Sequence, residues 1–356
     1  MLDLTVIILT GNEELHIKRC LENVSQVAKE VFVIDCYSKD KTVEIAESLD
    51  GLNGCKVTVL QHEWPATKYA GQFNWALENA DIKTEWVMRF DADEWMMPEL
   101  IDEIKEKLPK VEEGVTGIIM NRRHIFWGRW MKGGIYPVKM LRIWRRGKAI
   151  CEQRLMDEHM QILEGRIIEF EHDFCDENLH DISWFCEKHI GYAIREAVDL
   201  LDIELNLTGV AETDLNKVLE DQAMVKRKKK HAYAKKPLFW RSFVYFLYRY
   251  FLRCGWRDGK EGFVFTFFQG WWYRTLVDAK VYEIKKACGD DKERIVKYVK
   301  EMYNIDIKGV TSKTGGVICK VCNRLKRPLF VQENSCPDNI EVLSSIEKGG
   351  WLHEEA

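Results

Sequence analysis

Residues 5–9 read TVIIL, a continuous run of β-branched and aliphatic side chains that ends at Thr10. A run of this kind without polar alternation is typical of a strand buried on both faces of a sheet. The same signal returns at residues 31–34 (VFVI), 56–60 (KVTVL) and 86–90 (WVMRF). These runs alternate with segments of helical periodicity. We therefore predict an α/β fold with an open, largely parallel, Rossmann-like sheet and helices on both of its faces.

Helices are expected in the segments between these strands. The side chain of Asn12 is the expected cap of the first helix, and Ser38 or Asp40 that of the second. Apolar residues at helical spacing predict further helices at residues 69–80 and 183–201.

Polar residues follow three of the four predicted strands directly. Thr10-Gly11-Asn12-Glu13 comes after the first strand, Asp35 after the second, and Asp91-Ala92-Asp93-Glu94 after the fourth. In open parallel sheets, ligands bind beyond the carboxyl ends of the strands. We therefore expect these side chains to lie together and to form a binding site.

The chemistry of these loops differs from that of common nucleotide sites. No G-x-G-x-x-G follows the first strand and no Walker loop is present, so the loops offer carboxylates in place of glycine-rich nests. Carboxylates repel a nucleotide's phosphates unless a divalent cation lies between them. Alternatively, carboxylates bind the base and ribose as hydrogen-bond acceptors. Asp35 suits the base or ribose, while Asp91 and Asp93 suit Mg²⁺ or Mn²⁺ that also holds a diphosphate.

Three ordered motifs resemble those of a known family. They are residues 9–13 (LTGNE), 33–42 (VIDCYSKDKT) and 90–94 (FDADE), and they are similar to the signatures of the family 2 inverting glycosyltransferases, which have the GT-A fold. The likeness continues at residues 126–130 (FWGRW) and 141–147 (LRIWRRG), and it is greatest to the bacterial subgroup that adds glucose to the lipopolysaccharide inner core. It covers residues 1–200 well and becomes looser to about residue 285.

The resemblance implies a UDP-sugar donor and roles for individual residues. Asp93 would be the principal ligand of Mn²⁺ or Mg²⁺, and Asp91 would reach the ribose or the metal. Thr10 and Glu13 would line the nucleoside pocket, and Asp35 would contact the base. Asn12, Asp40 and Arg142 are further candidates for the nucleotide-sugar site. Arg142 or Arg145 would balance the donor phosphate charge, and a surface arginine is the alternative. His172 resembles a later histidine of the subgroup and would contact the metal or a phosphate; a surface histidine is the alternative.

An inverting transfer also needs a general base that takes the proton of the acceptor hydroxyl. The segment at residues 154–159 (RLMDEH) lies where the subgroup carries an acidic residue after a histidine. Glu158 aligns best with that acidic residue, and Asp157 is the second candidate. The histidine of the subgroup is absent at this place, since Asp157 occupies it and His159 follows.

A basic and aromatic segment comes later in the chain. Five basic residues at 226–230 precede a stretch in which Arg241, Tyr245, Arg249 and Arg253 recur every fourth residue among aromatic and aliphatic neighbours. This pattern favours a helix that lies on an anionic membrane surface, with residues 226–282 in the contact. A helical subdomain that packs its aromatic residues internally is the alternative.

The composition limits the partners and the compartment. The net charge of -4 over 356 residues argues against a nucleic-acid binder. The first residues lack a secretion signal, and no apolar stretch reaches about 18 residues, the length of a membrane span. Eleven cysteines without a disulfide framework indicate a reducing compartment. We expect a peripheral protein on the cytoplasmic face of the bacterial inner membrane.

The domain expectation follows from these segments. We predict a GT-A domain at residues 1–225, a membrane-associating helical segment at 226–287 and a tail at 288–356. The tail residues Cys319, Cys322, Cys336 and His353 would bind zinc or remain free thiols and a free imidazole; only one C-x-x-C pair is present.

The expected function is transfer of glucose or a similar hexose from a UDP-sugar to a hydroxyl of a lipid-linked or cell-surface glycan. A sugar nucleotidyltransferase is the first alternative, although its class relies on a glycine-rich basic loop where this chain has an acidic one. A non-catalytic, membrane-bound scaffold that binds nucleotides or glycans is the second.

Overall fold

The computed structural model describes residues 1–64, 68–152, 158–208 and 230–307, which all lie in one compact unit, Met1–Thr314. Its first part alternates strands and short helices, as the apolar runs predict. The elements are β1 (Leu4–Thr10), α1 (Ile17–Val24), β2 (Glu30–Asp35), α2 (Thr42–Ser48), η1 (Leu52–Gly54), β3 (Lys56–Gln61), α3 (Lys68–Asn79) and β4 (Trp86–Asp91).

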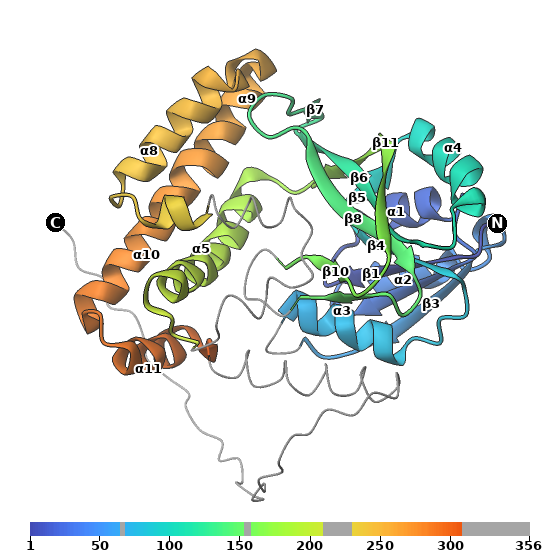
Figure 1. Ribbon diagram of the computed structural model, residues 1–356, viewed down its shortest axis with the longest axis horizontal. Coiled ribbons are helices and arrows are strands. Elements are labelled where there is room, and N and C mark those ends of the chain that lie inside the picture. The colour runs from blue at the N-terminus through green and yellow to red at the C-terminus, as the bar shows by residue number, and fades with distance from the viewer. Residues whose placement is uncertain (65–67, 153–157, 209–229, 308–356) are drawn as a thin grey trace, which may run out of the picture. The chain divides into compact units, whose positions relative to one another are not determined.

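The central sheet is parallel in one half and mixed in the other (Figure 1). Strands β3, β2, β1 and β4 are neighbours in that order and all run parallel, which confirms the predicted sheet. Beyond β4 the order continues with β8 (Val138–Arg145), β6 (Val115–Phe126), β11 (Arg166–Glu177) and β5 (Glu94–Met96). In this half only β6 and β11 pair in parallel, while β8 and β5 run antiparallel to their neighbours.

The remaining strands are short. Strand β7 (Arg129–Trp130) pairs with the end of β6, and β9 (Ala149–Cys151) pairs with β10 (Met160–Ile162) in a separate two-stranded sheet. Both small ladders are antiparallel, so they need no crossover helix.

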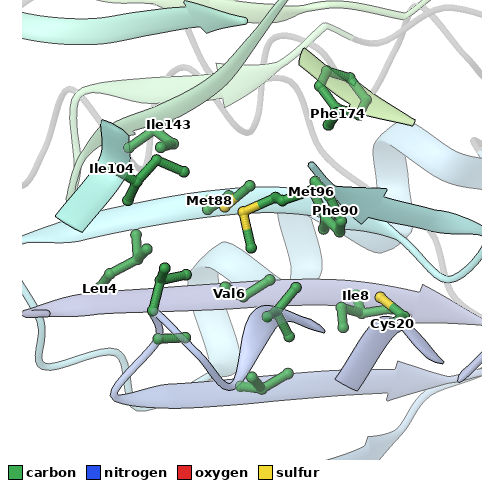
Figure 2. Close-up of a cluster of buried hydrophobic side chains, with 14 of the residues drawn as sticks. Leu4, Val6, Ile8, Cys20, Met88, Phe90, Met96, Ile104, Ile143 and Phe174 are labelled. Atoms are coloured by element: carbon green, nitrogen blue, oxygen red, sulfur yellow. The ribbon is translucent and has the colours of Figure 1, made fainter. Parts of the chain in front are cut away.

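Helices cover both faces of the sheet, and β1 shows why its sequence has no polar alternation. Leu4, Val6 and Ile8 face α1, α2 and α4 (Pro98–Lys107), whereas Ile7 and Leu9 face α3. Figure 2 shows Val6 and Ile8 among the apolar side chains of the first of these two cores. Each fully buried aliphatic side chain contributes about 1.5–3 kcal/mol. A strand buried on both faces therefore gains from an apolar residue at nearly every position.

The predicted cap of the first helix is wrong. Helix α1 begins at Ile17 after His16, four residues later than an Asn12 cap would place it. Asn12 has a positive φ of 60°, and its Oδ1 accepts a hydrogen bond from the Lys39 backbone at 2.8 Å. Asn12 therefore joins the loops that follow β1 and β2. A short side chain that bonds to backbone is well suited to this left-handed conformation.

The later part of the described chain is helical. After η2 (Leu108–Lys110), the helices are α5 (Ile182–Leu205), α8 (Trp240–Leu247), the π-helical turn η3 (Tyr248–Leu252), η4 (Gly255–Asp258), α9 (Gly259–Phe265), the π-helical turn η5 (Thr266–Trp272), α10 (Tyr273–Cys288) and α11 (Lys292–Tyr303). Helix α5 confirms the helix predicted at 183–201. Figure 1 shows α8, α9 and α10 as neighbours, and α10 also packs on α5 through Val277 and Val281.

The helical part contacts the sheet through the loop that follows β7. The Gly133 N–H donates to Asp258 Oδ2 at 2.7 Å, and the Gly134 N–H donates to the Arg253 carbonyl at 3.0 Å. A Cβ at Gly133 would lie 2.6 Å from the Cys254 carbonyl oxygen. Glycine is therefore the residue that permits this close approach of two backbones.

Two arginines of the stripe, Arg241 and Arg249, face inward, contrary to their expected position among lipid headgroups, whereas Arg253 is exposed. Arg241 and Arg249 are 6% and 3% exposed. The physical reason is local pairing for Arg241, whose Nη2 lies 2.6 Å from the Asp278 carboxylate on α10. Within the described residues, no helix combines the length and the apolar character that crossing a membrane requires.

Candidate functional site

A cavity of about 580 Å³ opens where the carboxyl ends of the central strands meet the helical part. Its walls come from the ends of β1 and β4, from β6 and β8, and from α5, η3 and α10. This volume is in the range of cavities that hold a small ligand. Of the predicted site residues with described positions, those on the wall are Glu13, Asp91, Asp93 and Glu158.

A buried ion pair supports the turn that carries Asp91 and Asp93. Strand β4 ends at Asp91 and β5 begins at Glu94, whose Oε2 accepts the Asp91 N–H at 2.9 Å. The guanidinium of Arg142 contacts the other oxygen of Glu94, and both side chains are 1% exposed. Arg142 Nη2 also lies 3.7 Å from Asp91 Oδ2. Arg142, predicted to hold the nucleotide sugar, is thus buried beneath the turn and absent from the cavity wall.

Asp91 and Asp93 have opposite electrostatic environments. Burial by itself would raise the pKa of Asp91, but the charges of Arg89 and Arg142 hold that pKa below its ordinary value. Burial raises the pKa of Asp93, and the charge of Asp176 raises it further. Asp93 is oriented by Asn178, whose Nδ2 donates to its Oδ2 at 3.2 Å. The fold therefore concentrates negative charge around Asp93 and leaves part of it uncompensated.

Asp176 is a wall residue that sequence reasoning missed. It lies near the carboxyl end of β11, and its Oδ2 is 3.0 Å from Arg122 Nη1 and 3.5 Å from His124 Nδ1. Burial would raise the pKa of Asp176, but the charges of Arg122 and His124 keep it well below its ordinary value. The acidic residues at the end of β11 were a sequence signal for a site residue, but the prediction chose His172 of the same strand instead.

His172 has another partner. Its Nδ1 lies 2.9 Å from Glu103 Oε2 on α4, and its backbone N–H donates to the same oxygen at 2.9 Å. His172 is absent from the cavity wall, because it precedes Asp176 by four residues on β11 and pairs with the helix outside the sheet.

The other predicted nucleotide contacts form the layer behind the wall. Asp35 is fully buried and accepts hydrogen bonds from Thr10 Oγ1 at 3.0 Å and from the Ser38 N–H at 2.9 Å. Burial acts to raise the pKa of Asp40, but hydrogen bonds from Thr42 and from the Glu14 N–H, the latter at 3.0 Å, keep this pKa below its ordinary value. Thr10, Asn12, Asp35 and Asp40 thus hold the shape of the two loops and do not line the cavity.

Glu13 lies on the wall and is oriented by a histidine. His16 Nε2 accepts the Leu179 N–H at 2.9 Å, so Nδ1 carries the proton of the neutral ring and donates to Glu13 Oε2 at 2.7 Å. These two hydrogen bonds of His16 connect the loop after β1 with the segment between β11 and α5.

The catalytic-base candidates differ in what can be described. Glu158 is half-buried on the wall, and its charge acts on the guanidinium of Arg89. Asp157 lies outside the described residues, as do the tail residues Cys319, Cys322, Cys336 and His353.

The carboxylates fit a divalent cation that shares its ligands with a diphosphate. In the described residues, no three His, Cys, Asp or Glu side chains are grouped closely enough to form a metal site by themselves. Mg²⁺ and Mn²⁺ sites of this class need only one or two carboxylates, because phosphate oxygens and water supply the rest. The repulsion that Asp93 receives from Asp91 and Asp176 is the kind that a bound cation relieves.

Much of the wall is basic or aromatic and was not predicted as a site. Arg249 comes from η3 and Arg274 from α10, while Lys188 and Tyr192 come from α5. These residues lie in helices that follow the strands by many residues, and no motif in the sequence joins them to the Asp91–Asp93 turn.

Comparisons with known proteins agree with the arrangement of the strand ends. Residues 5–167 match the family described as Glycosyl transferase family 2. An uncharacterized glycosyltransferase of Rickettsia bellii is 41% identical over 102 residues, which are 29% of this chain and 31% of the relative. The chain thus aligns with about a third of the length of the Rickettsia relatives that it matches.

A further sequence relative and a solved structure align over more of the chain. The lipopolysaccharide core biosynthesis glycosyltransferase LpsC of Rhizobium meliloti is 25% identical over 284 residues, which are 79% of this chain and 93% of the relative. The crystal structure of S. aureus TarS 1-349 in complex with UDP is 16% identical, covers 80% of this chain and 92% of that chain, and has a TM-score of 0.38.

Proposed function

We infer that this chain, whose residues 5–167 match Glycosyl transferase family 2, transfers a hexose from a UDP-sugar to a hydroxyl of a lipid-linked or cell-surface glycan. One observation carries the proposal. The turn with Asp91 and Asp93 ends the strand β4 and lines the same cavity as a further carboxylate, Glu158. A cation-binding pair and a separate base are the two parts that an inverting transfer requires.

The donor is proposed to bind at the carboxylate end of the cavity. Asp93, with Asp91, would hold Mg²⁺ or Mn²⁺, and Glu13 would line the nucleoside side. When bound, such an ion supplies positive charge to the departing diphosphate. The buried Arg142–Glu94 pair holds the turn in place, so these carboxylates need little reorganisation when the donor binds.

Glu158 is proposed as the general base. It would take the proton of the acceptor hydroxyl while the hydroxyl oxygen attacks the anomeric carbon and the bond to the diphosphate breaks on the opposite side. The proton ends on Glu158, the new glycosidic bond has the inverted configuration, and UDP leaves. Asp176 is a poorer base because Arg122 and His124 stabilise its charged form.

The acceptor and the location follow from two separate observations. The relative LpsC, which aligns over 93% of its length, is named for lipopolysaccharide core biosynthesis. An exposed aromatic face of this chain also supports membrane association. It consists of Trp240, Val244, Tyr248, Phe251, Leu252, Trp256 and Phe263, with exposed fractions from 44% to 76%. Arg253, Arg257 and Lys260 are exposed beside it.

This arrangement replaces the predicted one at the membrane. The apolar side chains point outward, whereas Arg241 and Arg249 of the stripe are buried. The apolar side chains would enter the headgroup region while the exposed Arg253, Arg257 and Lys260 meet anionic lipid. We propose peripheral binding to the cytoplasmic leaflet through this face.

The function is tested with the purified full chain. UDP-glucose and other nucleotide sugars are incubated with Mn²⁺, and both sugar release to water and transfer to extracted envelope glycolipid are measured. Asp93→Ala and Glu158→Gln should each lower transfer by about a hundredfold or more, as loss of a catalytic group does. Asp81→Ala, at an exposed carboxylate remote from the cavity, is the control. Full transfer by both variants contradicts the roles, and release of pyrophosphate from UTP and a sugar phosphate would indicate a nucleotidyltransferase.

A further inference from the structure

We infer that the helical part of the cavity is a binding site for an acidic sugar substituent, a phosphate or a carboxylate, centred on Arg249. The inference rests on the proposed function in one respect, namely that the sugar belongs to the acceptor. It would make the acceptor an anionic glycan, recognised at a distance from the reacting hydroxyl.

The first observation is the state of Arg249 itself. It lies on the π-helical turn η3, lines the cavity and is 3% exposed. Its Nε and Nη2 have no hydrogen-bond partner, and no carboxylate lies within ion-pair distance, among the residues that the structure describes. Its guanidinium lies 5.4 Å from the ring of Phe265 and 5.6 Å from the ring of Tyr245, and the Tyr245 side chain is also its hydrogen-bond partner. A buried guanidinium is costly unless it is paired.

Arg241 of the same segment is also buried, but its guanidinium has hydrogen-bond partners. It is two helical turns earlier and 6% exposed, so its burial is similar. Its Nε donates to Asp278 Oδ1 at 2.7 Å, and its Nη1 donates to the Ala234 carbonyl at 2.8 Å. The described fold therefore gives the Arg241 guanidinium a carboxylate partner, Asp278, and gives Arg249 on the cavity wall none.

A second arginine adds positive charge at the same place. Arg274 of α10 lies 5.6 Å from the ring of Tyr245, the ring that Arg249 also approaches. Arg274 pairs with Glu196 at 3.4 Å, but Lys230 contacts the same carboxylate oxygen at 3.1 Å. Lys230 also pairs with Asp199 Oδ2 at 2.7 Å, so two carboxylates balance Arg274 and Lys230. Arg249 adds a positive charge that has no carboxylate partner among the described residues. Burial and the neighbouring Arg274 both lower the pKa of Arg249, as expected for positive charge that lacks a counter-ion.

The geometry of the two unpartnered atoms selects the ligand. Nε–H and one N–H of Nη2 lie on the same edge of the planar guanidinium and point in the same direction. Two parallel donors match two oxygens of a phosphate or carboxylate. A Cβ at Gly134 would lie 3.4 Å from Nε, so glycine at this position keeps a side chain away from the same edge.

The acceptor is the better source of this anion than the donor. The charges that act on Asp91 come mainly from Arg89 and Arg142, and the positive charge that acts on Asp93 comes from Lys188. Arg249 instead shares its surroundings with Tyr245 and Arg274 of the helical part. The donor diphosphate belongs beside the Asp91–Asp93 turn, so the anion at Arg249 comes from the other substrate.

The test measures binding of small probes to the full chain by titration calorimetry. The probes are mannose 6-phosphate, galacturonic acid and neutral mannose, and UDP-glucose with Mn²⁺ is titrated separately. The variant is Arg249→Gln, and the control is Arg166→Gln, at an exposed arginine away from the cavity. We expect the wild type to bind at least one anionic probe tenfold or more tightly than mannose, Arg249→Gln to lose that preference, and Arg166→Gln to retain it.

The outcomes separate the possibilities. Preference for mannose 6-phosphate identifies a phosphate site, and preference for galacturonic acid identifies a carboxylate site. Equal binding of mannose, absence of anion binding, or an unchanged preference in Arg249→Gln overturns the inference. Loss of UDP-glucose affinity in Arg249→Gln assigns the arginine to the donor and also overturns it. Thermal unfolding adds a check, since a lower Tm of Arg249→Gln would show a structural arginine.

Failure of the proposed function is distinguishable from failure of this inference. If the wild type does not bind UDP-glucose but shows an anion preference that depends on Arg249, the glycosyltransferase proposal fails and the anion site stands.

Discussion

The guanidinium of Arg142 on β8 contacts the carboxylate of Glu94 on β5, and both side chains are almost completely buried beneath the turn that carries Asp91 and Asp93. Because Glu94 also accepts the Asp91 N–H, the pair connects the core of the sheet with the wall of the cavity. Burial raises the pKa of Glu94, and the charge of Arg142 opposes that rise. The net result is a Glu94 pKa well above its ordinary value, and the pair shapes the site from beneath without lining it.

Arg142→Met should destabilise the protein strongly. Removing one partner leaves a buried carboxylate without its counter-ion, and such a loss costs about 3–5 kcal/mol. Chemical denaturation measures the free energy of unfolding. The double variant Arg142→Met/Glu94→Met should recover part of this loss, because neither charge then remains. A double variant that is less stable than Arg142→Met would contradict this account.

Glu103 should make stability depend on acid pH. Burial acts to raise the pKa of Glu103, but hydrogen bonds from Lys107 and from the Glu171 and His172 backbones hold it at about 2, below its ordinary value of 4.5. A depressed carboxylate pKa stabilises the folded state above about pH 4.5, and this contribution disappears as the pH falls towards 2.

The variant Glu103→Gln isolates this contribution. At pH 7 it should be about 2–3 kcal/mol less stable than the wild type, and the difference should shrink below pH 4.5. Denaturation at a series of pH values measures the difference. If the difference in the free energy of unfolding between Glu103→Gln and the wild type is the same at pH 3 and pH 7, the charge of Glu103 is not the source of that difference.

Gly133→Ala should disturb the contact between the sheet and the helical part. The added Cβ would lie 2.6 Å from the Cys254 carbonyl oxygen and from Gly255, both of which are backbone. We expect a loss of about 1–3 kcal/mol and reduced transfer. Gly191→Ala is the matched control, since a Cβ there meets nothing within 4 Å and a glycine within α5 weakens that helix. It should stabilise by about 0.5–1 kcal/mol.

The exposed aromatic face should bind lipid. Replacing Trp240 and Leu252, which are 68% and 76% exposed, by serine should weaken binding to phosphatidylethanolamine–phosphatidylglycerol vesicles at least tenfold. The Tm should stay unchanged because these side chains contribute little to the core. Met302→Ser, at an exposed residue of α11, is the control in the same sedimentation assay. Equal vesicle binding by the double variant and the wild type would exclude this face as the contact.

The parallel half of the fold was predictable because its signals are local. Strands β1 to β4 each appear as an apolar run. Glu13 comes soon after the end of β1, and Asp91 and Asp93 come at and just after the end of β4. Glu13, Asp91, Asp93 and Glu158 were all chosen from the sequence and all line the cavity. Asp176 was not chosen with them, although the acidic end of β11 is visible in the sequence, because its place near Asp93 depends on the pairing of β11 with β6 and β5.

The sequence by itself determined the alternation of strands and helices and the position of Asp91 and Asp93 after β4, because backbone periodicity and burial are set by neighbouring residues. Only the tertiary structure decided which side of the arginine-rich helix is buried. Asp278, 37 residues after Arg241, turns that side inward by pairing with it. The same packing leaves Arg249 buried at the cavity without a carboxylate partner in the described chain. Solvation of a charge depends on everything around it, and that surrounding exists only after long-range contacts have formed.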